Sequence, residues 1–353
     1  MAIAAFDHPL LRGLLGDDET AVLLSPEAEL QAMIRFEVAL AEAEAEHGLI
    51  PAEAAEAISA AALTFTPAMA ELLQAVGRDG VVVPDLVRQL RLAVGEPHGQ
   101  HVHFGATSQD VVDTALVLRV RSVLDLVVRR LTEIIAAFDA LEARCGANAM
   151  QGHTRMQPAL PIRVADRINS WRSPIARERG RLEAWRTDSC TIQFGGAVGT
   201  LEKLDGKAAE VRHSLASRLS LADAPQWHSQ RDRIVELASL LALVTGSLGK
   251  FGQDIALMAQ DGSEIRLEGG GGSSAMPGKQ NPVAAEMLVT LARFNAVQIG
   301  GMHQAMVHEQ ERSGAAWTLE WLLLPQMLAA TGAATRHATR LLPSITNLGR
   351  AHS

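Results

Sequence analysis

Apolar residues recur every three or four positions through most of this chain, which is the spacing of one face of an α-helix. The longest such run extends from Ser108 to about Cys145 and predicts a single helix. Thr107 is a suitable N-cap for it, and Gly146 is a suitable stop. At about 1.5 Å per residue, this helix is a rod roughly 55 Å long. Its apolar positions are Val112, Leu116, Val120, Val123, Val127, Leu131, Ile134, Phe138 and Leu141.

The same spacing predicts further helices on both sides of this rod. Long helices are expected near residues 161–187, 230–260, 282–309 and 315–342, and shorter ones near 27–47, 53–62, 67–76 and before Gly95. No alternating pattern typical of β-strands extends over a useful length. Long helices joined by short loops bury their apolar faces only against one another. The sequence therefore predicts an all-α fold built on a long-helix bundle.

The helical pattern divides the chain into three segments. We expect an N-terminal helical domain over residues 1–105, a central long-helix bundle over 106–342, and a short tail over 343–353. Within the bundle, residues 261–282 break the helical pattern with glycines, so we expect a mobile loop there.

Composition narrows the class of protein. The formal net charge of −8 argues against nucleic acid as a partner. Cys145 and Cys190 are too few for a disulfide framework, which suits a reducing cytoplasm. Residues 1–15 lack the basic start of a signal peptide, and no apolar stretch is expected to reach membrane-spanning length. We therefore expect a cytoplasmic protein that contacts no membrane.

The loop at 261–282 carries the clearest chemical signal. The glycines Gly269 to Gly272 lead into the string Gly-Ser-Ser-Ala-Met-Pro-Gly-Lys-Gln-Asn-Pro, which ends at Pro282. Glycines let a loop close over a ligand, where amides and Lys279 stabilise negative charge and Ser273 supplies a hydroxyl. The order Gly-Lys-Ser/Thr after a strand, which a phosphate-binding loop needs, is absent. A solvated linker is the simpler alternative to an active-site lid.

This string resembles the signature of the fumarase/aspartase superfamily, which includes adenylosuccinate lyase, argininosuccinate lyase and the muconate cycloisomerases. The resemblance implies an all-α bundle that assembles into a homotetramer, with sites shared between subunits. It implies Ser273 as the catalytic base, Lys279 as a catalytic cation and Asn281 as a substrate ligand that helps to stabilise negative charge. It also implies no cofactor and no metal, and the sequence shows neither metal-ligand spacing nor a nucleotide fingerprint.

The start of the predicted rod resembles a second superfamily block. Thr107 and Ser108 offer hydroxyls, and the free amides of a helix start attract carboxylates. The simplest interpretation is a capped helix, and capping is compatible with ligand binding. By the resemblance, Thr107 and Ser108 bind a substrate carboxylate, and His103 is a candidate polar contact.

A third block, at residues 151–161, departs from the lyase pattern. Lyases that expel an amine show Thr-His-x-Gln here, whereas this chain has Thr-Arg-Met-Gln ending at Gln157. Arg155 is a poor proton donor but a good carboxylate partner. A carboxylate leaving group needs no proton, so Arg155 favours opening or closing a lactone over releasing an amine. His153 stands two residues earlier and could still supply an acid, so we assign it a catalytic role and assign Arg155 and Gln157 to substrate binding.

The order Trp227-His-Ser-Gln-Arg-Asp-Arg233 resembles the muconate cycloisomerase version of another block, with Arg231 as a substrate ligand. The resemblance implies a small tricarboxylate substrate and interconversion of 3-carboxy-cis,cis-muconate with 4-carboxymuconolactone. Two alternatives stay open. One is an adenylosuccinate-type lyase that breaks a C–N bond and releases fumarate, and the other is an inactive scaffold of the superfamily.

Overall fold

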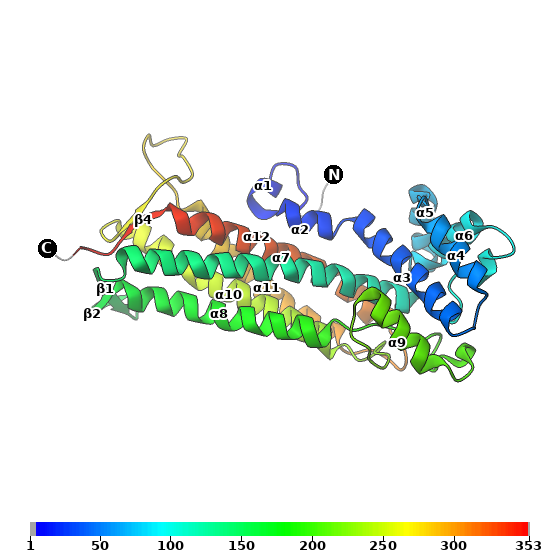
Figure 1. The fold of residues 1–353 in the computed structure, drawn as a ribbon. Helices are drawn as coiled ribbons and strands as arrows, with labels where there is room; N and C mark the ends of the chain where they lie inside the picture. Colours follow the sequence, from blue (N-terminus) through cyan, green and yellow to red (C-terminus); the bar gives the residue numbers. More distant parts are fainter. Residues whose placement is uncertain (1–4, 352–353) are drawn as a thin grey trace.

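Long, nearly parallel helices form the body of the protein in the computed structural model, which describes residues 5–351 (Figure 1). The all-α prediction is confirmed, and the first rod begins and ends where its cap and stop predict. Besides helices, the described residues form two small two-stranded sheets. The long helices are α7 (Ser108–Cys145), α8 (Val164–Ser189), α10 (Asp232–Asp261), α11 (Val283–Ala305) and α12 (Ala315–Ser344).

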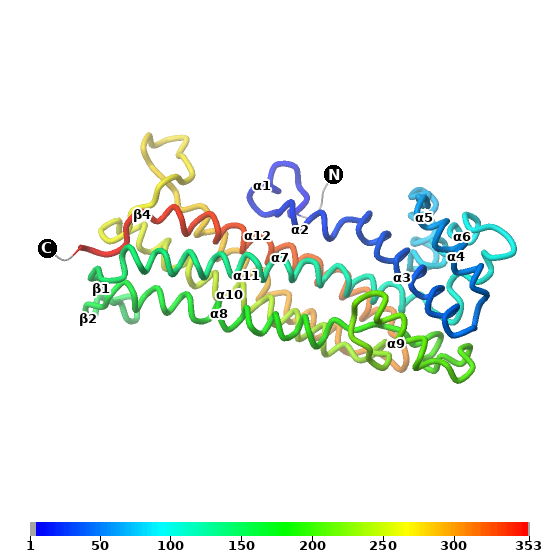
Figure 2. Tube along the Cα trace, in the orientation of Figure 1, coloured from blue at the N-terminus to red at the C-terminus, as the bar shows by residue number. Residues whose placement is uncertain are grey.

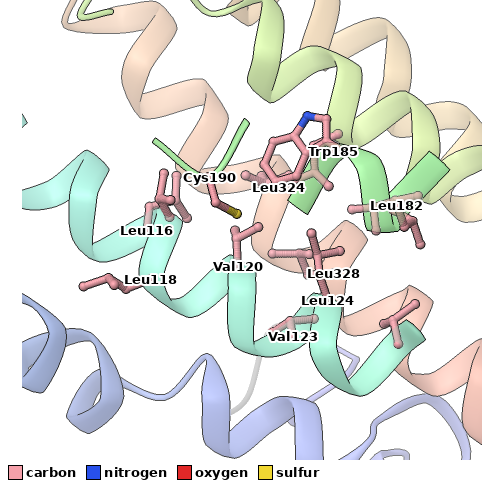
Figure 3. Packing of buried hydrophobic residues seen from close by; sticks show 14 of the residues in the cluster. Leu116, Leu118, Val120, Val123, Leu124, Leu182, Trp185, Cys190, Leu324 and Leu328 are labelled. Carbon is pink, nitrogen blue, oxygen red and sulfur yellow. The ribbon is translucent and has the colours of Figure 1, made fainter. Parts of the chain in front are cut away.

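The bundle core consists of the apolar stripes that the sequence spacing predicts. Figure 3 shows Val120 and Leu124 of α7 facing Leu328 of α12, with Leu182 and Trp185 of α8 close by. Such burial contributes about 25 cal/mol per Å² of apolar surface, so the shared core stabilises the straight rods.

An aromatic cluster fixes three of the rods further along the bundle. The ring centroid of Phe138 on α7 lies 5.1 Å from that of Phe251 on α10, and the ring centroid of Trp171 on α8 lies 5.2 Å from that of Phe251. The indole of Trp171 also donates a 2.7 Å hydrogen bond to Asp254. Edge-to-face contacts of this kind add specific geometry to the burial of the rings.

Most of the shorter helices gather at the end of the bundle where α7 begins, and the first two, over Arg12–Leu15 and Asp18–Leu23, lie along its side (Figure 1). The N-terminal segment was predicted to be helical, but α1 and α2 were missed because one or two turns give little periodic signal. The 12-residue helix α9, between α8 and α10, was also missed. These elements are α1 (Arg12–Leu15), α2 (Asp18–Leu23), α3 (Pro26–Glu46), α4 (Ala52–Ala62), α5 (Met69–Asp79), α6 (Val83–Val94) and α9 (Ala208–Leu219), with single 3-10 turns at Gly99–His101 and Glu202–Leu204.

Two small antiparallel sheets lie at the opposite end, where no strands were expected. Strand β1 (Ala149–Thr154) pairs with β2 (Gln157–Arg163), and β3 (Ile265–Leu267) pairs with β4 (Ile345–Leu348). The predicted helix start near residue 161 is therefore wrong, because β2 runs to Arg163 and α8 begins after it. The segment expected as a short tail also differs, since it completes α12 and supplies β4.

Helix α10 corrects a further expectation. By length and composition alone it is apolar enough to cross a membrane, although no such stretch was predicted. In the structure, 61% of its most apolar window is buried inside the protein. This is the composition of a core helix that is surrounded by its neighbours.

Candidate active site

The predicted site residues fall into two groups at opposite ends of the bundle (Figure 2). We call the residues around the start of α7 the α7 N-terminal cluster. We call those on the β1–β2 turn and the glycine-rich loop the hairpin–lid cluster. The two are separated by the 38 residues of α7, which span roughly 57 Å. The α7 N-terminal cluster contains His103, Thr107, Ser108 and Arg231, and the hairpin–lid cluster contains His153, Arg155, Gln157, Ser273, Lys279 and Asn281.

Asp110, in the first turn of α7, organises the α7 N-terminal cluster. Its carboxylate is fully buried, and a negative charge is favourable at a helix N-terminus. Five hydrogen bonds of 2.8–3.1 Å reach it from the amides of Thr107, Gly195 and Gly196 and from the side chains of Gln193 and His228. The glycine-rich turn that contains Gly195 and Gly196 is therefore fixed directly against the start of α7. A carboxylate with this many donors is held in one position.

Thr107 and Ser108 lie at this fixed helix start, as predicted. Both residues are half-buried. The first-turn amides of a helix have no intrahelical acceptors and point toward any bound anion. The arrangement can hold a carboxylate.

His103 lies just before this helix start in an unusual backbone conformation, with φ of 65°. Its Nδ1 is 2.6 Å from Oε1 of Glu37, a buried carboxylate of α3. Burial acts to lower the pKa of the imidazole, but the charge and hydrogen bond of Glu37 outweigh it and raise the pKa of His103. The pair holds the ring in one orientation. Strain of this kind clusters at functional positions.

Arg231 is placed differently from the substrate ligand that was predicted. Its guanidinium is buried and donates to two carboxylates, Asp113 of α7 and Glu320 of α12, at 2.5–3.2 Å. Burial opposes the charge, yet these carboxylates raise the pKa of Arg231. A guanidinium whose N–H groups donate to two protein carboxylates has no face left for a substrate. Arg231 therefore joins helices rather than binding a ligand.

Arg312 is a polar residue of this cluster that the sequence did not single out. It precedes α12, and its Nε donates to Oε1 of Gln109 at 2.9 Å. One of its terminal nitrogens donates to the carbonyl of Ala197 in the glycine-rich turn at 3.1 Å. The side chain is exposed and cationic, and its partner Gln109 follows Ser108 in α7. The only signal was its position in the charged string that follows α11.

The hairpin–lid cluster presents His153, Arg155 and Gln157 on an exposed β-hairpin. Arg155 and Met156 form its turn, with φ of 47° and 65°, between the paired residues Thr154 and Gln157. Two consecutive positive φ angles are typical of a tight two-residue turn that normally takes Asn or Gly. The sequence pattern placed Arg155 shortly before a helix expected near residue 161, and the hairpin instead projects it outward. It can therefore reach an anion outside its own bundle.

The glycine-rich loop protrudes beyond the bundle at the same end as this hairpin (Figure 1). Gly271 and Asn281 pair through two backbone hydrogen bonds of 3.0 and 2.8 Å, which close the loop at its base. Ser273 Oγ accepts hydrogen bonds from the amides of Ala275 and Met276 at 3.3 and 3.1 Å. Two donors aimed at one hydroxyl stabilise its anionic form. Lys279 is exposed in the same loop and supplies a positive charge.

Comparison with known proteins shows which proteins share this architecture. Residues 20–299 match the family model described as lyase. The chain is 39% identical to the 3-carboxy-cis,cis-muconate cycloisomerases of Bradyrhizobium diazoefficiens and Pseudomonas aeruginosa, over 92% of its length and 74% and 72% of theirs. It superposes on the 3-carboxy-cis,cis-muconate lactonizing enzyme from Pseudomonas putida with a TM-score of 0.90 and 36% identity, covering 96% of this chain and 77% of that one.

The chain belongs to the lyase family of the fumarase/aspartase superfamily. The family match includes both clusters, from His103 through Asn281, and it ends within α11. Arg312 lies beyond it, but the superposition on the lactonizing enzyme covers nearly the whole chain. Family membership, the helix start and the glycine-rich loop were all foreseen from the sequence.

Proposed function

We propose that this lyase-family chain is a cycloisomerase that interconverts 3-carboxy-cis,cis-muconate and 4-carboxymuconolactone. The observation that carries the proposal is its 39% identity, over 92% of the chain, to proteins named for that activity. Arg155 adds a chemical reason, because it stands where an amine-releasing lyase would carry an acid. A carboxylate that leaves or attacks near neutral pH needs no such acid.

The reaction moves one proton and forms one bond. In the lactonising direction, a carboxylate oxygen attacks a conjugated double bond, and the new C–O bond pushes the electron pair onto the adjacent carbon. That carbon's own carboxylate shares the charge as an aci-carboxylate until the carbon takes a proton. In the reverse direction, a base removes this proton and the ring carboxylate leaves. Donors and cations at the aci-carboxylate therefore supply the largest catalytic contribution.

Each cluster supplies a different part of this chemistry in our proposal. Thr107 and Ser108 bind one carboxylate through hydroxyls and first-turn amides, and His103 contributes a polar contact. Arg155 binds a second carboxylate through parallel hydrogen bonds. The remaining roles belong to the hairpin and the lid: Ser273 moves the proton, Lys279 stabilises the aci-carboxylate, His153 assists proton transfer, and Gln157 and Asn281 bind substrate.

The site is completed between subunits of a homotetramer in this proposal. Roughly 57 Å of α7 keeps the clusters of one chain apart, so a complete site needs clusters from different chains. The hairpin also exposes Met156 and Leu160 to 73% and 77%, which suits packing against another copy. We place this tetramer in the cytoplasm, in keeping with its buried, unpaired cysteines.

The decisive experiment follows the diene absorbance of 3-carboxy-cis,cis-muconate with purified protein, beside a parallel assay with adenylosuccinate. We expect loss of the diene signal and no adenylosuccinate cleavage. Ser273→Ala should lower turnover by at least ~100-fold, since it removes the group that moves the proton. Ser274→Ala, a change at the adjacent serine, is the matched control and should retain activity.

Two other results would replace the proposal. Cleavage of adenylosuccinate without lactonisation would establish the amine-lyase alternative and would give His153 the role of acid. Thermal stabilisation by the tricarboxylate without turnover of either substrate would establish an inactive scaffold.

A further inference from the structure

His103 has one ring nitrogen bound to the protein and one that is not. Its Nδ1 lies 2.6 Å from Oε1 of Glu37 on α3, a residue 66 positions away in the chain. The other nitrogen, Nε2, makes no hydrogen bond within residues 5–351. The side chain is 15% exposed, and Nε2 is not one of the buried polar atoms that lack a partner. A molecule from outside the chain can therefore reach Nε2.

The protonation state of the ring decides what Nε2 can bind. A carboxylate only accepts hydrogen bonds, so the contact with Glu37 keeps a proton on Nδ1. In the neutral imidazole Nε2 is then an acceptor, and its lone pair repels a carboxylate. In the imidazolium Nε2 carries a proton and donates, and the positive charge strengthens the bond. His103 can therefore bind an anion only while its ring is charged.

The groups around the ring favour the charged form. Burial acts to lower the pKa of His103, and the charge of Arg91 on α6 acts in the same direction. The charges of Glu37 and of Asp110 on α7 outweigh both, so the pKa lies above its ordinary value of 6.5. Asp110 also accepts from His228 and from backbone amides, whereas Glu37 contacts the His103 ring directly. Glu37 is therefore the residue on which the charge of His103 depends most.

A second buried acid on α3 does not compete for this role. Oε1 of Glu44 would lie 3.8 Å from a Cβ atom at Gly105, so Glu44 packs under the segment that carries His103. Burial and the charge of Glu37 raise the pKa of Glu44 to about 9, which keeps Glu44 protonated at neutral pH. Of these two buried acids, only Glu37 provides a negative charge for the ring.

We propose that Glu37 is a positioning residue that keeps His103 as an imidazolium, so that Nε2–H donates to the carboxylate held at the start of α7. This inference deepens the proposed function and rests on the substrate-binding role that it gives to His103. It adds a positive charge to the α7 N-terminal cluster, where the guanidinium of Arg231 is already bound to Asp113 and Glu320.

Glu37→Gln tests the inference, because it keeps the size of the side chain and an acceptor oxygen but removes the charge. At pH 6.5, we expect the KM of the intact assembly for 3-carboxy-cis,cis-muconate to rise at least about tenfold. The kcat should stay within about twofold, since a contact made equally in the ground and transition states acts on KM.

The pH profile distinguishes a lost charge from a damaged fold. In the parent protein KM should stay low until pH exceeds the raised pKa of His103, above 6.5, and should then increase. In Glu37→Gln the increase should begin at lower pH, and near pH ~5 the KM should return toward the parent value because the ring is protonated without Glu37. A KM equal to that of the parent at every pH, or one that stays raised at low pH, would overturn the inference.

Glu44→Gln is the matched control on the same helix. Glu44 is uncharged over this pH range, so its replacement should leave KM and its pH profile unchanged. A shift in Glu44→Gln as large as that in Glu37→Gln would mean that any change in this buried pair has the same effect, and it would refute the specific role of Glu37.

A direct titration of His103 separates this inference from the proposed function. NMR of protein with isotope-labelled histidine measures the pKa of the imidazole without substrate, and His103→Gln identifies its signal. We expect Glu37→Gln to lower this pKa, and an unchanged value would overturn the inference even if the diene is consumed. A lowered value in a protein that does not consume the diene would reject the proposed reaction and still support Glu37 as the residue that keeps His103 charged.

Discussion

At the scale of single residues, short sequence patterns identify candidate chemical groups more readily than they predict which residues those groups pair with. Arg231 was recognised as part of a charged block, but its partners Asp113 and Glu320 lie 118 and 89 positions away in the chain. Only the packing of α7 against α12 reveals that all three are buried together. Ser273, Thr107 and Ser108, by contrast, were recognised within short strings whose chemistry is local. Long-range pairing is the part of the site that local patterns cannot encode.

Removing Arg231 should destabilise the protein strongly. Arg231→Met leaves two buried carboxylates without their cation, and breaking a buried pair costs about 3–5 kcal/mol. Denaturant unfolding at matched protein concentration should show this loss in the free energy of unfolding. Arg233→Met is the control, because Arg233 is only half-buried, and its effect should be much smaller. A loss below ~1 kcal/mol for Arg231→Met would show that the triad contributes little.

Glu44 makes stability depend on pH. Its carboxyl group on α3 is fully buried with neither oxygen hydrogen-bonded within the described residues, and burial together with the charge of Glu37 raises its pKa to about 9. The folded state therefore retains a proton that the unfolded state releases above its ordinary pKa of 4.5. Stability from this group is complete below that value and declines as pH rises toward 9.

Glu44→Gln tests this dependence with a neutral side chain of the same shape. At about 1.4 kcal/mol per pKa unit, the variant should be more stable by roughly 3 kcal/mol at pH 7. The difference should vanish near pH 4 and be largest near pH 9. Glu53→Gln on the exposed surface of α4 serves as the control. Equal unfolding free energies for Glu44→Gln and the parent protein across this range would contradict the raised pKa.

At the scale of elements, the sequence predicted long helices well and the hairpin not at all. Both ends of α7 follow from local cap and stop residues together with a long periodic stripe. The apolar spacing predicted a helix that starts near residue 161, where Pro161 stands, and proline is compatible with the first turn of a helix. In the structure it lies in β2, in a two-stranded sheet where a missing N–H costs little. One residue type fits both conformations, and only tertiary pairing decides between them.

The hairpin turn should gain stability from glycine. Met156 holds a φ of 65°, a conformation that costs an ordinary residue about 1 kcal/mol or more. Met156→Gly should therefore raise the free energy of unfolding by about 1 kcal/mol, less the added flexibility of the unfolded chain. The same change at Met69, the first residue of α5, should lower it, because glycine weakens a helix. If Met156→Gly and Met69→Gly lowered the free energy of unfolding equally, the turn would carry no strain.

At the scale of the whole molecule, the rod explains why the site is divided. Straight helices of this length place the α7 N-terminal cluster and the hairpin–lid cluster at the two ends of every copy. The sequence predicts which residues belong to the proposed site, and the family match assigns the fold. The sequence gives no direct measure of the distance between the two clusters, because that distance depends on α7 being straight. Because each protomer is elongated and its clusters lie at opposite ends, the proposed catalysis requires assembly of several protomers.

Mixed assemblies test this division directly. A Ser273→Ala chain is defective in the hairpin–lid cluster, and a chain with Thr107→Ala and Ser108→Ala is defective in the α7 N-terminal cluster. Each alone should be inactive. If every site takes its two clusters from different chains, random co-assembly in equal amounts leaves about one quarter of the sites with both clusters intact. Co-expressed and co-purified mixtures should therefore regain about a quarter of the parent activity, whereas the two proteins purified separately and mixed without exchange should not. A co-assembled mixture that stays inactive would mean that both clusters of a site come from a single chain, and the rod geometry rules out that arrangement unless α7 bends.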